Sequence, residues 1–169
     1  MTEQEVRQSV VEACRSLNAL GVNQGTSGNV SVRFEGRILI SPSAIPYEEM
    51  RPEQVPMMRL EGGEEWEGPC RPSTEWRFHR DILRDRAEVG AVVHAHPPFC
   101  TALAMARRGI PPCHYMVGVF GGSDVRCAEY ATFGTQALSE AALRALEGRS
   151  ACLLGNHGTI VCGPTLRRA

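Results

Sequence analysis

The sequence predicts a single α/β domain in which helices cover a mixed, largely antiparallel sheet. Segments with apolar residues at helical spacing alternate along the chain with short apolar or alternating runs. Turn-forming glycines and prolines separate these segments, and no repeat or low-complexity linker divides them. Because 169 residues suffice to bury one core, residues 1–169 are expected to form one domain.

The first sixty residues predict a helix, a hairpin and a further strand. Residues 3–20 carry a helical apolar stripe that stops at Gly21, namely Val6, Val10, Cys14 and Leu17. Residues 29–34 and 37–41 alternate apolar and polar side chains around a Glu-Gly turn, which is typical of a hairpin. Residues 54–60 are expected to add another strand.

The remaining residues alternate between helices and strands. A helix is expected to start at Pro72-Ser73-Thr74-Glu75 and to run to about Asp85, because a hydroxyl can cap it and a glutamate favours its positive end. Its stripe consists of Trp76, His79, Ile82 and Leu83. A strand over 89–96 follows, and Pro97-Pro98 ends it because proline cannot donate to the ladder. The last predicted elements are helices over 98–107 and 134–147 and strands over 151–154 and 159–162.

The composition excludes several classes of function. The net charge is -1, so the chain has no basic footprint for nucleic acid. No apolar stretch approaches the roughly 20 residues of a membrane helix, and the polar start Met1–Glu5 is unlike a signal peptide. Seven scattered cysteines without a C-x-x-C pair predict buried thiols in a reduced, cytoplasmic protein.

The chain contains no lysine, since all 18 of its basic residues are arginines. This excludes Schiff-base chemistry on a lysine of this chain, covalent attachment of pyridoxal phosphate, and a P-loop lysine. A protein of this composition that activates a carbonyl group therefore needs a metal or hydrogen bonds.

A pair of histidines at a strand end is the most informative local feature. Side chains at i and i+2 of a strand point to one face, so His94 and His96 are expected to project together. Two adjacent imidazoles suit a divalent transition metal, with zinc the first choice, although such a pair also arises by chance. His157, in a glycine-flanked turn, is a candidate third ligand, and three protein ligands with an open position describe a catalytic zinc site.

Glu75 is the natural acid/base partner for such a site. It stands at the start of the helix that precedes the His94 strand, so it can lie near the strand's far end. An acid that merely complements the helix dipole is the alternative. His79, four residues on, shares its face, and we expect a hydrogen-bonded core histidine rather than a ligand.

Three small-residue loops are candidates for binding an anion. They are Thr26-Ser27-Gly28-Asn29, Ser41-Pro42-Ser43-Ala44 and Pro72-Ser73-Thr74. Glycine lets backbone N–H groups approach a phosphate, and a helix start supplies unpaired donors. Without lysine, phosphate binding would rest on these neutral donors, helped at most by an arginine; ordinary turns are the alternative.

In chain order, these and further motifs resemble the class II aldolase/adducin-head family. The motifs are Gly25-Thr26-Ser27-Gly28-Asn29-Val30-Ser31, Ile40-Ser41-Pro42-Ser43-Ala44-Ile45-Pro46-Tyr47, Ser73-Thr74-Glu75-Trp76-Arg77-Phe78-His79, Ala91-Val92-Val93-His94-Ala95-His96, His114-Tyr115-Met116, Tyr130-Ala131-Thr132-Phe133-Gly134-Thr135 and Leu153-Leu154-Gly155-Asn156-His157-Gly158. The resemblance covers nearly the whole chain. Within the family it is closest to the aldolases that cleave L-fuculose 1-phosphate.

The resemblance implies both a fold and a site. The fold would be a three-layer α/β/α domain, usually in a homotetramer with active sites between subunits. The implied metal ligands are His94, His96 and His157, with Zn²⁺ expected and Co²⁺ or Mn²⁺ as other choices. Glu75 would be the acid/base, and Tyr115 would act in a neighbouring subunit's site. The substrate phosphate would be held by Gly28, Asn29, Ser43, Ala44, Ser73 and Thr74.

The implied activity is the reversible cleavage of a ketose 1-phosphate to dihydroxyacetone phosphate and an aldehyde. L-fuculose 1-phosphate, a 5-deoxypentulose 1-phosphate and 5-methylthioribulose 1-phosphate are the candidate substrates. Related epimerases, of which the ribulose-5-phosphate type carries an aspartate at the position of Glu75, sugar-acid phosphate decarboxylases and a methylthioribulose-phosphate dehydratase are alternatives. A non-catalytic adducin-like interaction module is disfavoured by the presence of every metal ligand. A zinc protease is disfavoured because no H-E-x-x-H occurs.

The sequence departs from the family pattern in three places. Ala44 stands where the aldolases usually have glycine, and Asn156 precedes His157 where a second histidine is common. The chain also ends at Ala169, whereas family members continue through a helical tail that helps to close the site. This last departure bears on the choice of aldehyde more than on the metal.

Overall fold

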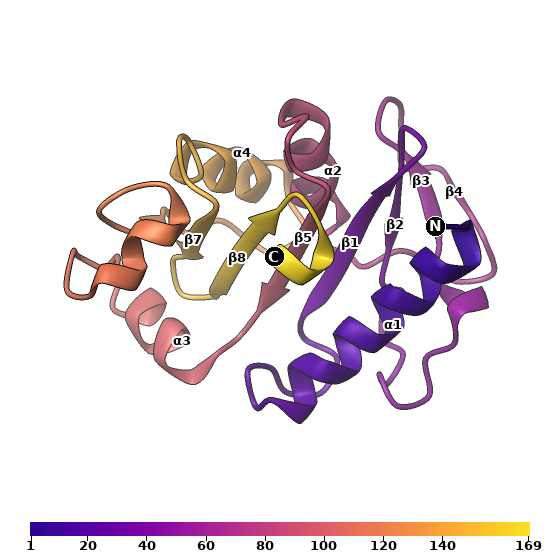
Figure 1. The fold of residues 1–169 in the computed structure, drawn as a ribbon, viewed down its shortest axis with the longest axis horizontal. Helices are drawn as coiled ribbons and strands as arrows, with labels where there is room; N and C mark the ends of the chain where they lie inside the picture. The colour runs from indigo at the N-terminus through magenta and orange to yellow at the C-terminus, as the bar shows by residue number, and fades with distance from the viewer.

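A single eight-stranded sheet organises the computed structural model, which describes residues 1–169 (Figure 1). The strand order across the sheet is β4-β3-β2-β1-β5-β8-β7-β6. All neighbouring strands are antiparallel except β6 and β7, which are parallel. The strands are β1 (Asn29–Phe34), β2 (Arg37–Ile40), β3 (Met57–Arg59), β4 (Trp66–Glu67), β5 (Ala91–Ala95), β6 (Arg126–Ala128), β7 (Ala151–Leu154) and β8 (Gly158–Gly163). The predicted mixed, largely antiparallel sheet is confirmed.

Helices cover both faces of this sheet. The helices are α1 (Glu3–Ala19), α2 (Trp76–Asp85), α3 (Pro98–Met105) and α4 (Gln136–Ala145), and the short 3-10 helices are η1 (Pro52–Gln54), η2 (Tyr115–Phe120) and η3 (Leu166–Arg168). In Figure 1, α1 crosses one face of the sheet, and α2 and α4 lie together on the other. The predicted three-layer α/β/α fold is therefore confirmed.

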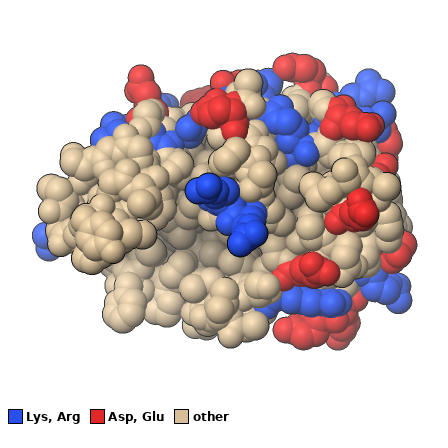
Figure 2. All heavy atoms as spheres, in the orientation of Figure 1, with Lys and Arg blue, Asp and Glu red and all other residues tan.

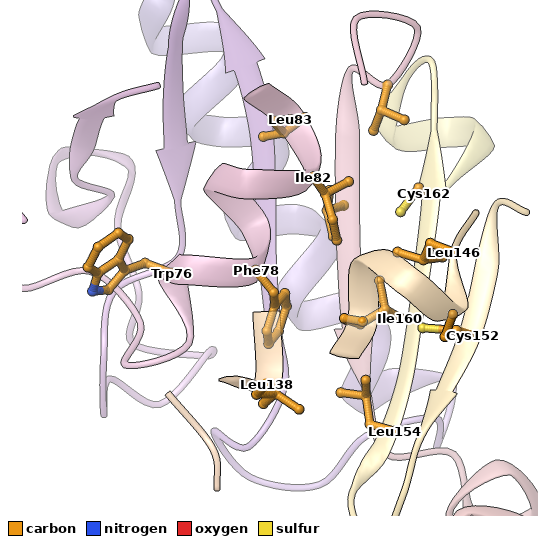
Figure 3. Packing of buried hydrophobic residues seen from close by; sticks show 14 of the residues in the cluster. Trp76, Phe78, Ile82, Leu83, Leu138, Leu146, Cys152, Leu154, Ile160 and Cys162 are labelled. Atoms are coloured by element: carbon orange, nitrogen blue, oxygen red, sulfur yellow. The ribbon is translucent and has the colours of Figure 1, made fainter. Parts of the chain in front are cut away.

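Side-chain alternation along the strands divides the core between the two faces. In β2, Ile38 and Ile40 pack toward α2 and α4, whereas Leu39 packs toward α1. Figure 3 shows the α2/α4 side, where Phe78 and Ile82 of α2 pack with strand residues such as Ile160. Each strand residue thus contributes to only one of the two helical layers.

A buried carboxylate fixes α2, the helix that carries Glu75 at its start. Asp81 of α2 accepts hydrogen bonds from Ser139 (2.6 Å) and Gln136 (2.8 Å) of α4. Arg84 also pairs with Asp81 at 2.9 Å. These bonds add to the apolar packing between the two helices and fix the position of α2 over the sheet.

Two short strands were not predicted from the sequence, and a third was predicted to be longer than it is. Residues 54–60 contain only the three-residue β3, because η1 begins at Pro52 and the prolyl nitrogen of Pro56 cannot donate. β4 and β6 have two and three residues, too few for alternation to be recognised. Helix α2 begins at Trp76 rather than at Ser73, with Glu75 in the N-cap position.

Charges are unevenly distributed over the face of the molecule seen in Figure 2. Acidic and basic side chains cover the part near α1 and the upper edge, whereas the part over α3 and η2 is largely uncharged. The exposed apolar side chains of α3 and η2 are Phe99, Met105, Tyr115, Met116 and Val119. None of the helices has the length and apolar character needed to cross a membrane.

Candidate active site

The three predicted histidine ligands meet at the end of the central strand β5. His94 is the fourth residue of β5, and His96 follows the strand directly. His157 lies in the turn between β7 and β8. Ala95 of β5 pairs with Thr159 of β8, and this pairing brings the turn to the end of β5. One nitrogen from each imidazole lies within 4.8 Å of the others. The predicted convergence of the H-x-H pair with His157 is present.

Backbone and side-chain acceptors orient two of these imidazoles. His94 Nδ1 lies 2.9 Å from the carbonyl oxygen of Thr159, which can only accept, so Nδ1 carries a hydrogen and Nε2 is the ring nitrogen left for a metal. His96 Nδ1 lies 3.2 Å from Oδ1 of the buried Asn23. The Asn23 amide nitrogen donates to Asn18, which directs Oδ1 toward His96. Such partners fix the ring orientation of metal-binding histidines.

The turn that carries His157 needs its small residues. Asn156 has a φ of 57°, in the left-handed region that asparagine tolerates better than most residues. A Cβ on Gly158 would lie 2.7 Å from the Ala95 carbonyl oxygen and 2.8 Å from a His96 ring carbon. Glycine at 158 therefore lets β8 approach β5 closely enough to bring His157 to His96.

The histidine cluster fits a bound cation. His94 Nε2 is buried without a hydrogen-bond partner and lies 3.2 Å from Glu75 Oε2. A cation bound at this nitrogen would give the buried polar atom the partner that it lacks. Burial lowers the pKa of His96 to about 4 and also lowers the pKa of His157. Both imidazoles are thus neutral at pH 7, the form that binds metals.

Glu75 lies against the histidine cluster, as the sequence predicted. Its Oε1 is 3.4 Å from His157 Nε2, and its Oε2 accepts a hydrogen bond of 2.9 Å from Asn29 Nδ2. Burial by itself raises the pKa of Glu75, whereas the hydrogen bond from Asn29 and the positive charge that His94 and His157 carry when protonated lower it to about 2. The Glu75 side chain is therefore a carboxylate at neutral pH, and Oε1 has no hydrogen-bond partner.

A cavity of about 360 Å³ opens above the cluster. All three predicted anion-binding loops line it, with Glu75, His96 and His157 at its floor. No arginine lines the cavity, so the neutral donors of the loops are its only candidates for binding an anion. The lining residues contributed by the loops are Thr26, Ser27, Gly28, Asn29, Pro42, Ser43, Ala44, Ser73 and Thr74.

The backbone donors of these loops divide into two groups. The N–H groups of Ser43 and Ser73 donate to the carbonyls of Arg71 and Ser41, which leaves only their hydroxyls for a ligand. The N–H groups of Gly28, Ala44 and Thr74 have no acceptor in the protein. Each loop therefore offers at least one unpaired backbone donor.

Two positions in these loops impose different demands on the backbone. A Cβ on Gly28 would lie 2.7 Å from the His94 carbonyl oxygen, so only glycine fits there. Ala44 has a φ of 59°, a conformation that disfavours any residue with a Cβ. The departure from the family pattern at position 44 thus strains the backbone.

Replacing Ala44 with glycine should increase the free energy of unfolding by about 0.5–1 kcal/mol, since relief of the left-handed strain exceeds the greater chain entropy of glycine. Urea denaturation would measure the change. Ala87→Gly, in another exposed loop where φ is not positive, should instead lower stability. Equal destabilisation by both substitutions would contradict the strain at Ala44.

The structure separates Tyr115 from the other predicted site residues. Tyr115 is 83% exposed in η2 and does not line the cavity of its own chain. Sequence reasoning missed Asn23, whose role depends on a contact with a residue 73 positions away. It also did not select Tyr130 and Phe133, two exposed aromatics at the cavity rim, although both lie in a motif recognised as family-like.

Comparison with known proteins agrees with this geometry. The model of the Class II Aldolase and Adducin N-terminal domain matches residues 8–169. The chain is 51% identical over 164 residues to the 5-methylthioribulose-1-phosphate/5-deoxyribulose-1-phosphate aldolase of Rhodospirillum rubrum, covering 97% of this chain and 73% of that protein. It is 41% identical over 169 residues to the L-fuculose phosphate aldolase of Escherichia coli, covering 100% of this chain and 78% of that one. A solved L-fuculose 1-phosphate aldolase superposes with a TM-score of 0.92 at 37% identity, covering 96% of this chain and 77% of that chain.

Proposed function

The chain belongs to the class II aldolase and adducin N-terminal domain family, and on that premise we propose that residues 1–169 form a metal-dependent ketose-1-phosphate aldolase domain. The reaction is the reversible cleavage of a ketose 1-phosphate to dihydroxyacetone phosphate and an aldehyde. The observation that carries the proposal is the carboxylate of Glu75 beside three converging histidines, at the floor of a cavity lined by neutral donors.

His94, His96 and His157 are the proposed metal ligands, with Zn²⁺ as the metal. Three imidazoles leave one position open, as in catalytic zinc sites. When bound, the ion supplies Lewis-acid polarisation of the ketose oxygens, in place of the lysine that the chain lacks. The Nδ1 bonds of His94 and His96 keep the opposite ring nitrogens available as ligands.

Glu75 is the proposed acid/base. In cleavage the C4 hydroxyl proton passes to solvent by way of Tyr115 of a neighbouring subunit, the C3–C4 bond breaks with its electron pair left on C3, and Glu75 gives C3 of dihydroxyacetone phosphate a proton that it has taken up from solvent. In condensation the Glu75 carboxylate removes that proton before C3 attacks the aldehyde. Its ionised form in the free protein is the form that condensation requires.

The three loops are the proposed phosphate site. The unpaired N–H groups of Gly28, Ala44 and Thr74 and the hydroxyls of Ser43 and Ser73 would surround the anion. Phosphate binding at these loops would place C3 of the substrate near Glu75. The aromatic side chains of Tyr130 and Phe133 at the cavity rim suit an aldehyde that ends in a methyl or methylthio group.

A second copy of the chain is the proposed partner of the uncharged surface over α3 and η2. Exposed apolar side chains of both elements, including Phe99 of α3 and Tyr115 of η2, belong to this surface. Tyr115 is absent from the cavity of its own chain and is therefore available to a neighbour's cavity. A homotetramer in which Tyr115 handles the C4-oxygen proton of a neighbouring site accommodates both observations.

The proposed location is the cytoplasm. All seven cysteines are free thiols, and three of them are buried. Disulfides are rare in the reducing cytoplasm, so a chain with seven unpaired thiols fits that compartment.

The experiment that tests the function is a substrate panel. Dihydroxyacetone phosphate release should be observed with at least one of L-fuculose 1-phosphate, 5-deoxyribulose 1-phosphate and 5-methylthioribulose 1-phosphate. Ribulose 5-phosphate is the control, because its phosphate lies at the opposite end of the carbon chain. Epimerisation of ribulose 5-phosphate without cleavage of any ketose 1-phosphate would contradict the aldolase proposal.

A further inference from the structure

A buried hydrogen-bond chain connects β1 and α2 behind Glu75. Side chains two residues apart on a strand are separated by about 6.6 Å, and those four apart on a helix by about 6 Å, so two pairs can face each other in register. Asn29 and Ser31 of β1 face Glu75 and His79 of α2 in this way. All four residues are buried.

Three contacts form the chain. Asn29 Nδ2 donates to Glu75 Oε2 at 2.9 Å, His79 Nε2 lies 2.5 Å from Asn29 Oδ1, and Ser31 Oγ lies 2.7 Å from His79 Nδ1. Of these four hydrogen-bonded residues, only Asn29 and Glu75 line the cavity. His79 is fully buried and stacks on Phe78, so it cannot contact a substrate.

The carboxylate determines the direction of every hydrogen bond in this chain. A carboxylate can only accept, so Asn29 must turn its NH₂ group toward Glu75 and its oxygen toward His79. His79 must then carry its hydrogen on Nε2, which leaves the Nδ1 lone pair to accept from the Ser31 hydroxyl. Reversing one bond would leave two acceptors or two donors facing each other.

The two Glu75 oxygens therefore have different surroundings. Oε2 receives the Asn29 amide, whereas Oε1 has no hydrogen-bond partner and lies 3.4 Å from His157 Nε2. We infer that His79 is a positioning residue, which acts through Asn29 to anchor Glu75 Oε2 and leaves Oε1 as the proton-transferring atom. The inference rests on the proposed acid/base role of Glu75.

Loss of the His79 donor should misplace the carboxylate. In His79→Leu, Asn29 Oδ1 is buried without a donor, so the Asn29 amide loses the bond that holds it in place and no longer fixes Glu75 Oε2. A misplacement of about 1 Å costs on the order of 100-fold in rate. In His79→Gln, the amide nitrogen replaces Nε2 as the donor to Asn29, so this substitution should rescue the effect.

The test measures proton transfer in the metal-loaded enzyme without an aldehyde. Exchange of the C3 hydrogen of dihydroxyacetone phosphate with deuterated solvent, followed by NMR, reports on proton transfer by Glu75 without the steps at the C4 oxygen. In His79→Leu, we expect this exchange and kcat to fall together, by about 10- to 100-fold, with little change in KM or metal content. His79→Gln should retain at least about a third of the wild-type exchange rate, since its donor to Asn29 is kept.

Two controls separate positioning from general destabilisation. Ile82→Ala, in the same buried face of α2, should reduce thermal stability without slowing exchange. Ser31→Ala is the second variant should His79→Leu fail to fold. It removes the hydroxyl that donates to His79 Nδ1, so His79 is no longer held with its hydrogen on Nε2, and the change of volume is minimal. We expect a several-fold loss of exchange.

Three results would overturn the inference. They are full exchange in His79→Leu, full exchange in Ser31→Ala, and equal losses in the leucine and glutamine variants. Absence of exchange in the unaltered enzyme would instead overturn the proposed function, and the role of His79 with it.

Discussion

Replacing Glu75 with glutamine is expected to lower kcat for ketose 1-phosphate cleavage by about 10³-fold, within the range of an acid/base residue. The glutamine side chain has nearly the same shape and can still accept from Asn29. It cannot take up or deliver a proton at neutral pH. Steady-state kinetics of dihydroxyacetone phosphate release, with metal analysis of the same sample, would measure the effect.

The expected loss in Glu75→Gln is specific to proton transfer. The metal content should remain that of the unaltered protein, because the three histidines are unchanged. Exchange of the C3 hydrogen of dihydroxyacetone phosphate should disappear together with cleavage. Glu140→Gln, an exposed residue of α4, is the matched control and should leave both rates unaltered. Near-normal turnover in Glu75→Gln would show that another group carries the proton.

Removal of the metal is expected to abolish cleavage. The chain has no lysine to activate the carbonyl covalently, and no arginine lines the cavity to act electrostatically. Dialysis against a chelator should therefore reduce activity to background, and added Zn²⁺ should restore it. Titration with Co²⁺ and Mn²⁺ would identify which other ions support the reaction.

Graded substitutions connect this loss to the histidine cluster. His94→Ala should eliminate stoichiometric metal binding, since His94 is the buried member of the cluster. Asn23→Ala removes the acceptor that orients His96 and should weaken metal affinity by about 10- to 100-fold. Gln24→Ala, at an exposed neighbouring side chain, should bind metal normally. Cleavage that survives complete removal of the metal would refute the proposed mechanism.

Local patterns were sufficient to predict most helices and strands. The stripe of Val6, Val10 and Cys14 gave α1 almost to its last residue, and alternation around a Glu-Gly turn gave the hairpin of β1 and β2. β4 and β6 were missed because strands this short depend on pairing with β3 and β7, which no local pattern records.

The candidate site likewise combines residues that local patterns predict with residues that only the tertiary fold brings in. Residue type and i, i+2 spacing identified His94 and His96, a glycine-flanked turn and a helix start made His157 and Glu75 candidates, and the ordered motifs strengthened the whole set. Asn23 could not be found by spacing, since it meets His96 only after α1 and β5 pack against the intervening strand. The three loops were predicted as a set to bind an anion. Only the fold shows that the backbone N–H groups of Ser43 and Ser73 already donate to the carbonyls of Arg71 and Ser41.

By itself, the sequence determined the fold class, the three imidazoles, the carboxylate and the absence of a lysine, because these follow from residue type and local periodicity. The tertiary structure decided which atoms of those residues remain free. Convergence of β1, β5, β8 and α2 commits Nδ1 of His94 to a carbonyl, Oε2 of Glu75 to Asn29, and His79 to the chain behind it. Hydrogen-bond partners come from segments distant in sequence, so the direction of each bond exists only once the layers have packed.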